Sequence, residues 1–320
     1  MLSTSTPPGL RVAVEATPII ERSRMMKGSD YADLILKTFI ESLDEHGTDW
    51  QKGWMTTGSS GFLPVNGVTG AEYNGSNVFI LMALGAGCGF ESNQWATYRQ
   101  WQSAGKQVVK GQKATGWVRR FVSGTYEDRE GEEQFYQTMK VSAVFNEEQL
   151  EGYERTEPPA KPNEVEQQAI ADSFITSLNA DVREGGDRAF YVPKADYINM
   201  PPQWKFKDTS DATATQNYYS TLMHEHVHWT GHSSRLDRDM SGSSFSQSYA
   251  FEELVAELGS VLLSLTLSLT RQPTPDHAKY INGWKKGLQD SPKLLLKAMA
   301  KAQQSVDWMQ EKQSSKMAAE

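Results

Sequence analysis

Cysteine is almost absent from the sequence, which has one such residue, Cys88, among 320. A disulfide framework needs at least two cysteines, so none can form, and this usage is typical of a reducing compartment. Cys88 stands in a glycine-rich apolar stretch, where we expect a small buried side chain. We therefore expect a cytoplasmic protein whose fold depends on its hydrophobic core.

Long apolar runs are also missing. A helix that crosses a bilayer needs about 18 to 20 apolar residues in succession, and no segment provides them, so we expect no membrane span. The N-terminal stretch is rich in Ser, Thr and Pro and lacks the apolar centre of a signal peptide. We expect residues 1–28 to form a poorly ordered tail.

The chain also lacks an excess of positive charge. The chain has 32 Lys and Arg against 40 Asp and Glu, which gives a formal net charge of −8. A protein that is basic all over is therefore excluded, and any contact with nucleic acid must come from a local patch. With 38% apolar and 22% charged residues, the chain has an ordinary globular composition and is long enough for two domains, each with its own core.

Hydrophobic periodicity predicts the order of helices and strands. In the first half we expect helices over 30–45 (capped by Ser29), 77–84 and 94–103 (capped by Ser92), and then a hairpin of strands 115–122 and 137–145. In the second half we expect a helix over 165–178, strands over 189–192 and 197–200, helices over 215–230 and 249–258, and a helical segment over 276–310.

A proline-rich run, residues 157–162, separates the two halves, because it can form neither helix nor sheet. The expected organisation is a first domain over 29–155, a linker over 156–164, a second domain over 165–311 and a tail over 312–320. The fold class predicted from this order is α+β.

The pattern His-Glu-x-x-His occupies residues 224–228 and lies in a segment with helical spacing. On a helix, residues four apart share a face, so His224 and His228 can direct two imidazoles at one metal ion. Glu225 lies beside them, where a carboxylate can take a proton from a metal-bound water. This spacing predicts the site of a metal-dependent hydrolase. The alternative is a solvated helix face with several histidines and ion pairs.

A third ligand is still required, and the helix expected over 249–258 offers one. Glu253 and Glu257 are four residues apart, so Glu253 can reach the metal while Glu257 holds the outer nitrogen of a ligand histidine. Glu252 points elsewhere on this helix. His232 is the competing third ligand, and Glu257 remains open as well. His226 lies off the ligand face and is expected to be packed or exposed to solvent.

A second constellation lies between residues 95 and 122, which contain six basic residues and no acid. Single-stranded nucleic acid binds where aromatic rings stack on bases and cations follow the phosphates. The alternative is that the aromatic residues build the core and the cations are a solvated face. The basic residues are Arg99, Lys106, Lys110, Lys113, Arg119 and Arg120, the aromatic residues include Trp95, Tyr98, Trp101 and Trp117, and the loop residues Trp50, Trp54 and Tyr73 add to them.

Several blocks of the sequence together resemble one family, the ArdC-type antirestriction proteins, whose N-terminal part is shared with plasmid TraC-like primases. Residues 66–77 are similar to the signature N-x-x-T-G-x-x-Y-x-G-x-N, and residues 95–100, 109–113 and 144–149 to the blocks that follow. Residues 224–235 and 249–259 are similar to the family's metallopeptidase blocks. The resemblance covers nearly all of residues 29–310. Two departures are Gly53, where proline is frequent, and His226, where an aliphatic residue is usual.

The resemblance implies an N-terminal α+β domain that binds single-stranded DNA and a C-terminal, mainly helical zincin-like metallopeptidase domain with a small sheet. It implies protection of incoming plasmid or phage DNA from host restriction. It also favours Glu253 over Glu257 as the third ligand. The expected DNA-binding set includes Asn77 in addition to Tyr73, and both lie in the signature segment. The expected cofactor is Zn²⁺, with Mn²⁺ or another divalent ion as the alternative.

Three hypotheses for the function follow. The first is a monomeric, DNA-binding metallopeptidase in which Glu225 is the general base. Its protein substrate, for example a host restriction component, would pair with the strands near Tyr191 and Ile198. The second is a protein without enzymatic activity that coats single-stranded DNA and has a structural or vestigial metal site. The third, a primase accessory factor, ranks last because the sequence has no acidic cluster suited to nucleotidyl transfer.

Overall fold

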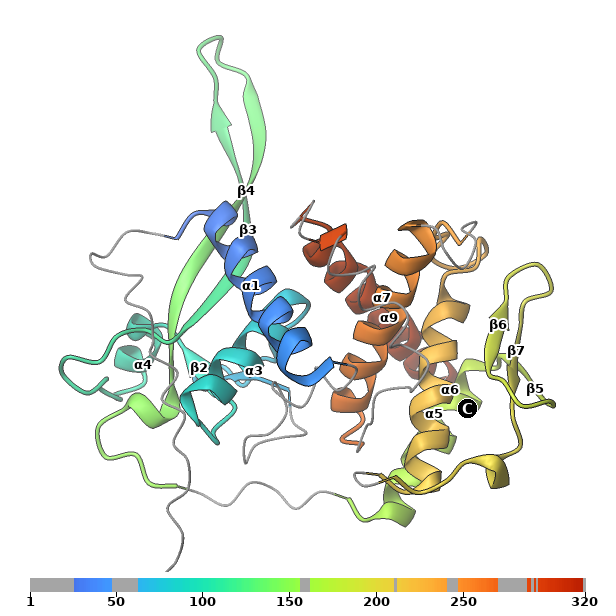
Figure 1. Cartoon of the computed structure of the whole chain (residues 1–320). Coiled ribbons are helices and arrows are strands. Elements are labelled where there is room, and N and C mark those ends of the chain that lie inside the picture. Colours follow the sequence, from blue (N-terminus) through green and yellow to red (C-terminus); the bar gives the residue numbers. More distant parts are fainter. Residues whose placement is uncertain are drawn as a thin grey trace, which may run out of the picture.

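A computed structural model describes residues 26–47, 63–155, 162–209, 212–240, 247–269, 287–288, 291 and 293–318. The expected stacking residues Trp50 and Trp54 and most of the expected linker lie outside these ranges. The α+β class and the two-domain arrangement are confirmed (Figure 1). None of the helices in the described ranges has the length and apolar character of a membrane span.

The N-terminal domain is built on a four-stranded sheet in the order β1-β2-β4-β3. Strands β1 and β2 are parallel, and the other neighbours are antiparallel. The elements in chain order are α1 (Gly28–His46), β1 (Val65–Asn66), α3 (Ser76–Cys88), β2 (Gln94–Ala96), α4 (Tyr98–Ser103), β3 (Gly116–Glu127), β4 (Glu133–Asn146) and the 3-10 helix η2 (Glu147–Gln149).

The residues of the N-terminal signature hold this domain together. Asn77, on α3, accepts a hydrogen bond from the backbone N–H of Arg119 at 2.8 Å and donates one to the Arg119 carbonyl at 2.9 Å, which locks α3 to β3. The Tyr73 hydroxyl donates to the Trp95 carbonyl at 3.1 Å. Gly67 lies so close to the ring of Trp101 that a Cβ there would come within 2.1 Å of it. Asn77 and Tyr73 of the signature therefore have packing roles in this domain.

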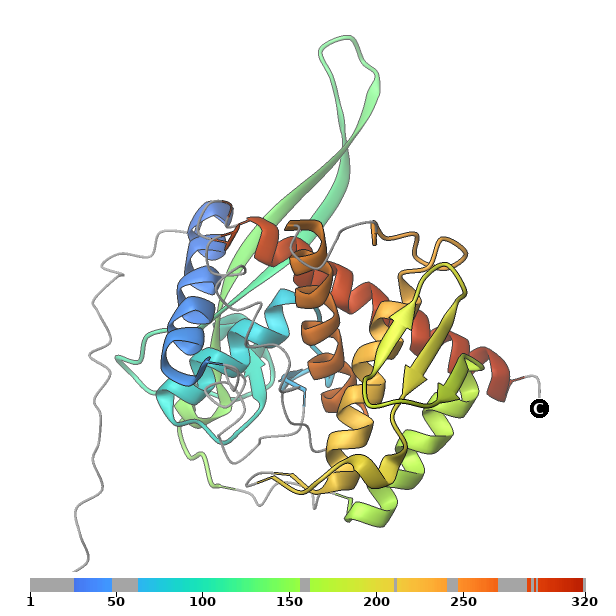
Figure 2. The same cartoon turned by 45° about the vertical axis from the view of Figure 1, so that its right-hand side comes forward.

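The hairpin of β3 and β4 is longer than expected and projects away from both domains (Figures 1 and 2). Its register pairs Gly116 with Val144 at the base and Glu127 with Glu133 at the tip. The outer part of the hairpin exposes large aromatic side chains on both faces, namely Phe121, Tyr126, Phe135 and Tyr136.

The C-terminal domain combines long helices with a small sheet in the order β5-β7-β6. Strands β5 and β7 are parallel, whereas β6 and β7 are antiparallel. The elements are α5 (Glu164–Leu178), β5 (Asp181–Glu184), β6 (Phe190–Val192), β7 (Tyr197–Met200), the 3-10 helix η3 (Gln203–Lys205), α6 (Ala214–Thr230), α7 (Gln247–Thr266) and α9 (Lys293–Met317).

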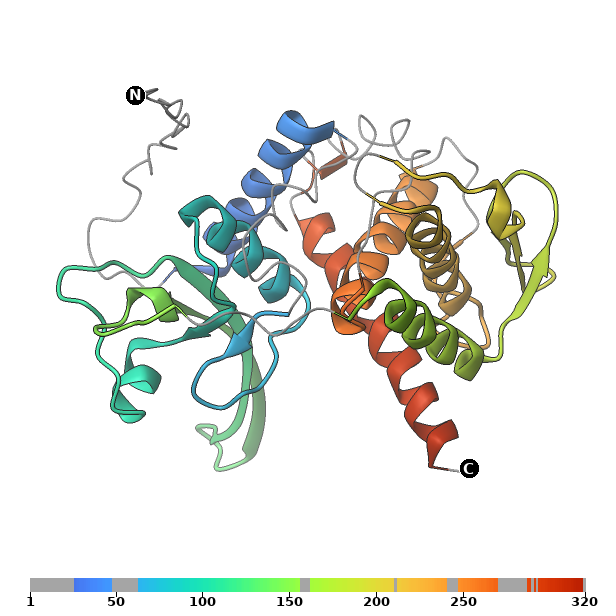
Figure 3. The same ribbon diagram turned by 90° about the horizontal axis from the view of Figure 1, so that it is seen from below.

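The main hydrophobic core is continuous across the two domains, in place of one separate core for each, and a smaller cluster around Trp101 lies within the N-terminal domain alone. The main cluster of buried side chains runs from Tyr31 of α1 to Met309 of α9. Helix α9 lies between the two domains (Figure 3) and contacts α1 and α3 as well as α7. The side chain of Gln303, on α9, accepts a hydrogen bond from the backbone N–H of Gly75 at 2.7 Å.

Local expectations differ from the structure in several places. The helix expected over 94–103 is a strand followed by a short helix, and Thr97 caps that helix in place of Ser92. Helix α1 begins after Lys27 and is not capped by Ser29. Strand β5 was not expected, and α9 continues to Met317, into the expected tail. Cys88 is exposed at the end of α3, because the helix ends there at the surface.

Helices α6 and α7 approach closely at Gly259, and this contact yields a first prediction. A Cβ on Gly259 would lie 2.8 Å from Cγ1 and 3.0 Å from Cγ2 of Val227, a β-branched residue that is stiff in a helix. We expect Gly259→Ala to lower the free energy of unfolding by about 1–2 kcal/mol, because overpacking outweighs the gain in helix propensity. Denaturant titration measures this change.

Gly87, on α3, serves as the control because a Cβ there meets open space. Gly87→Ala is expected to stabilise the protein by up to about 1 kcal/mol through helix propensity alone. Val227→Ala should cost less stability in the Gly259→Ala background than in the wild type, because it relieves the overlap there. A neutral or stabilising Gly259→Ala substitution would show that the two helices do not need this close approach.

Candidate metal centre

Helix α6 positions the two expected histidine ligands. Thr213 caps its start, since its hydroxyl accepts from the Gln216 N–H and the Gln216 side chain accepts from the Thr213 N–H. This is the reciprocal capping arrangement that favours a helix start. His224 and His228 follow one turn apart and are 4% and 8% exposed. Their Nε2 atoms lie 3.1 Å from each other.

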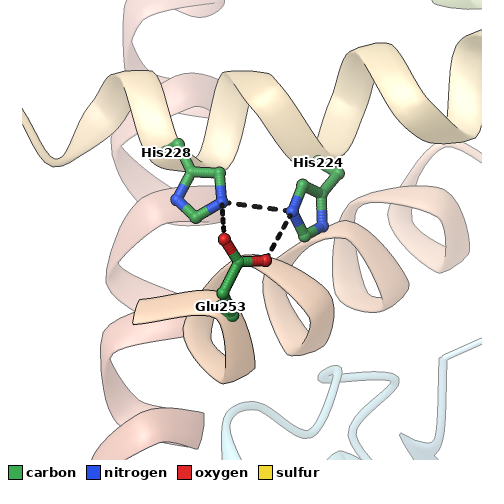
Figure 4. Close-up of side chains that lie close together, drawn as sticks. All are labelled: His224, His228 and Glu253. Atoms are coloured by element: carbon green, nitrogen blue, oxygen red, sulfur yellow. Dashed lines mark hydrogen bonds and ion pairs between the residues drawn. The ribbon is translucent and has the colours of Figure 1, made fainter. Parts of the chain in front are cut away.

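Helix α7 brings Glu253 to the same point (Figure 4). Glu253 Oε2 lies 3.6 Å from His224 Nε2, and Oε1 lies 3.7 Å from His228 Nε2. Ligands at zinc-type bond lengths of about 2.1 Å in a tetrahedron are about 3.4 Å apart. The three residues thus form a group whose ligand atoms have the separations that one ion requires. Neither Glu257 nor His232 belongs to this group.

The outer nitrogens of both imidazoles face carboxylates. His224 Nδ1 lies 3.6 Å from Glu257 Oε2, as expected for a group that orients a ligand histidine. His228 Nδ1 lies 3.3 Å from Glu252 Oε1. The expectation that Glu252 points elsewhere is therefore wrong. The ring of His228 lies where Glu252 and Glu253, adjacent on α7, can reach its two nitrogens.

The carboxylates around His224 and His228 favour positive charge at the centre. Burial disfavours a charged imidazole, but hydrogen bonds with Glu253 and Glu257 outweigh it and raise the pKa of His224 to about 10. Burial tends to raise the pKa of Glu253. Contacts with His224 and His228 and a hydrogen bond with Tyr249 outweigh this effect and hold the pKa well below its usual range. A divalent cation at this point would supply the charge that a proton supplies otherwise.

Glu225, the expected general base, is buried beside this group and is 7% exposed. Its charge contributes to the raised pKa of His224, so it lies within electrostatic reach of the imidazole. No other residue of α6 combines an acidic side chain with this position next to a ligand histidine.

The remaining histidines near the site have other partners. His226 is fully buried, its Nδ1 lies 2.7 Å from the Leu222 carbonyl, and burial lowers its pKa to about 4. His226 is therefore packed in the interior and not exposed to solvent, which is one of the two outcomes expected from the sequence. His232 lies beyond α6, where its Nδ1 is 2.8 Å from the Ser234 hydroxyl. The structure thus groups Glu253, and not His232, with the two imidazoles.

Several residues of the expected DNA-binding set belong to the core. Trp95 is 1% exposed and Trp101 is fully buried, so neither ring can stack on a base without opening the domain. Asn77 is buried in the contact between α3 and β3. Trp117 and Tyr73 are half-buried and pack against the main core. For these aromatic residues the alternative reading, a role in packing, fits the structure better.

The rest of the set is accessible. Tyr98 is 42% exposed, and the exposed cations are Arg99, Lys106, Lys110, Lys113 and Arg120, with Arg119 half-buried. Lys106 forms an ion pair with Glu147 at 3.0 Å. Sequence reasoning missed the exposed rings of Tyr126, Phe135 and Tyr136. The first strand was expected to end at 122 and the second to begin at 137, so these residues were assigned to the connection between the strands.

Comparison with known proteins identifies the family. The chain is similar to the antirestriction ArdC protein from plasmid R388 in its metal-free crystal structure, with 33% identity, a TM-score of 0.73, and coverage of 89% of this chain and 98% of that one. This chain belongs to the ArdC antirestriction family. The Mn(II)-bound structure of that protein matches with 34% identity and a TM-score of 0.70 over the same shares of the two chains.

Matches to individual domains and to other relatives agree with membership in the ArdC family. Residues 29–156 match the N-terminal domain of anti-restriction factor ArdC, and residues 169–301 match a zincin-like metallopeptidase. An uncharacterized protein, y4eC, of Sinorhizobium fredii is 35% identical over 89% of this chain and 93% of its own length. DNA primase TraC of Escherichia coli is 33% identical over 87% of this chain, which spans only 27% of TraC.

Proposed function

We propose that this ArdC-family protein binds single-stranded DNA and carries a metal-dependent peptidase-type site, and that it protects incoming plasmid or phage DNA from host restriction. The convergence of His224, His228 and Glu253 from two helices is the observation that carries the hydrolytic part. The family relation supports the antirestriction role. The proposed protein substrate is a component of the host restriction system.

His224, His228 and Glu253 would hold a divalent cation, which supplies Lewis-acid chemistry and acidifies water when bound. Two imidazoles and one carboxylate suit zinc, our first choice, and also manganese, which the R388 protein binds in one structure. Glu225 would take the proton of the attacking water and pass it to the leaving amine. Strand β6 is an edge of its sheet and contacts α6, so an extended peptide could pair with it near the site.

For single-stranded DNA we propose the exposed surface of α4 and of the loop that follows it to residue 115. Tyr98 provides a ring for stacking, and the exposed lysines of the loop provide contacts for phosphates. Arg120, at the base of the hairpin, extends the set. This surface lies on the side of the N-terminal domain that faces away from α6 and α7 (Figures 1 and 3).

Salt dependence tests the DNA surface. The triple variant Lys110→Ala, Lys113→Ala, Arg120→Ala is expected to reduce the slope of log affinity against log salt by about 2, since each phosphate contact to a single strand contributes about 0.7. Fluorescence anisotropy with a single-stranded oligonucleotide measures the slope. The charge-matched control replaces Lys194, Lys207 and Lys293, all exposed in the C-terminal domain, and should leave the slope unchanged. Equal slopes for the triple variant and wild type would refute the surface.

The separation of the two sites favours a second candidate function, a coat on single-stranded DNA that needs no hydrolysis. The proposed DNA surface shares no residue with the metal centre, so binding alone could shield DNA from a nuclease. Elemental analysis of purified protein, together with a gel shift on a single-stranded oligonucleotide, tests the two parts separately. A gel shift by protein that contains no metal supports the DNA-coating function. Absence of both the gel shift and the metal contradicts the whole proposal.

A further inference from the structure

Arg238 lies between α6 and α7, and its side chain is only 3% exposed although it is charged. A buried guanidinium is costly unless its donors are satisfied. Its Nη2 donates to Glu252 Oε1 at 2.7 Å, and its Nε donates to Glu252 Oε2 at 3.0 Å. This two-point contact fits the planar fork of arginine, which lysine cannot reproduce.

The same guanidinium is fixed to two further helices. Its Nη2 donates to the Val227 carbonyl at 2.6 Å, and its Nη1 donates to the Thr230 hydroxyl at 2.9 Å, both near the end of α6. Its Nη1 also donates to the Ser305 hydroxyl, on α9, at 2.9 Å. Arg238 therefore holds the Glu252 carboxylate in one place relative to α6 and α9.

Glu252 lies behind His228, with Oε1 3.3 Å from Nδ1. A carboxylate at this distance accepts the Nδ1 proton, leaves the Nε2 lone pair for the metal and fixes the plane of the ring. We propose that Arg238 and Glu252 are positioning residues, which align His228 and thereby set the metal affinity of the centre. This inference rests on the proposed metal centre and is independent of the peptidase reaction.

Arg235, three residues earlier in the same segment, provides a matched control. Its side chain is 9% exposed. Its donors engage Asp196, the Tyr191 hydroxyl and the Trp229 carbonyl, and, unlike those of Arg238, not the Glu252 carboxylate. Loss of Arg235 therefore removes a buried cation from the same segment without touching Glu252.

The test measures Zn²⁺ and Mn²⁺ affinity of the full chain by competition with a chromophoric chelator. Glu252→Gln and Arg238→Gln are each expected to weaken binding about 10- to 100-fold, the usual effect of losing a partner of a ligand histidine. The double variant should be no weaker than the worse single variant, because both substitutions break the same chain of contacts. Arg235→Gln should keep wild-type affinity, and the visible spectrum of the Co²⁺-loaded protein should change only in the Glu252 and Arg238 variants.

Wild-type affinity of Glu252→Gln would overturn the inference, as would equal weakening by Arg235→Gln. If Arg238→Gln does not fold, Glu252→Asp replaces it, since the shorter carboxylate keeps the charge for Arg238 but withdraws from His228. Undiminished binding by Glu252→Asp would then count against the proposal. If wild-type protein binds neither ion, the metal centre itself fails. If it binds and the variants bind equally well, only the positioning roles fail.

Discussion

Glu225→Gln is expected to reduce peptide hydrolysis about 100- to 10,000-fold, the range that a general base contributes. The amide has nearly the shape of the carboxylate but cannot take a proton. Because Glu225 is not in the group of metal ligands, the metal content should stay at the wild-type level. Turnover of a peptide library and elemental analysis of the same preparation measure the two quantities.

The same variant separates the two candidate functions. If Glu225→Gln still protects DNA from a restriction nuclease while hydrolysis is lost, protection does not require the peptidase reaction and the coat is supported. If protection falls together with hydrolysis, the enzyme is supported. Wild-type hydrolysis by Glu225→Gln would exclude Glu225 as the base. Thermal unfolding without metal serves as the control, since Glu225 is buried and its replacement must leave the fold intact.

Among the three candidate third ligands, Glu253→Ala is expected to have the largest effect on metal binding. It removes the only carboxylate that lies within 4 Å of both ligand nitrogens among the described residues. We expect a loss of affinity greater than the roughly 10- to 100-fold that follows from losing an outer partner. The stabilisation conferred by metal should disappear as well, which amounts to about 2.7 kcal/mol at a concentration 100 times Kd.

Two other substitutions decide among the possible third ligands. Glu257→Gln should weaken binding only in the range of an outer partner, because Glu257 faces Nδ1 and not Nε2 of His224. His232→Ala should leave metal affinity unchanged. Isothermal titration with Zn²⁺ ranks the three variants. An effect of His232→Ala equal to that of Glu253→Ala would move the third ligand to His232.

The position of the metal group could be inferred from sequence because it depends on the helical period. Residues four apart fall on one face of any α-helix, so the pairing of His224 with His228 needs no tertiary information. The contact of Glu252 with His228 was not predicted, because it depends on tertiary packing and not on the helical period alone. Whether one residue of α7 or its neighbour reaches the partner helix depends on how α7 is rotated about its own axis, and packing decides that rotation.

Composition alone does not show which aromatic residues of the expected DNA-binding set are accessible to a base. A tryptophan in a basic stretch looks the same in sequence whether it stacks on a base or fills the core, and burial decides between them. A local signal did exist for α4. Thr97 and Gln100 have the spacing of a capping box, which marks a start at residue 98 and leaves Trp95 to a strand.

The core that joins the two domains has a consequence for how genes of this type can recombine. A breakpoint between the coding regions of the domains would leave apolar sides of α1, α3 and α9 facing water, and the resulting fragments would be prone to aggregate. The pair should therefore be inherited as one cassette. The match to the TraC primase agrees with this expectation, because it covers 87% of this chain and only 27% of the primase.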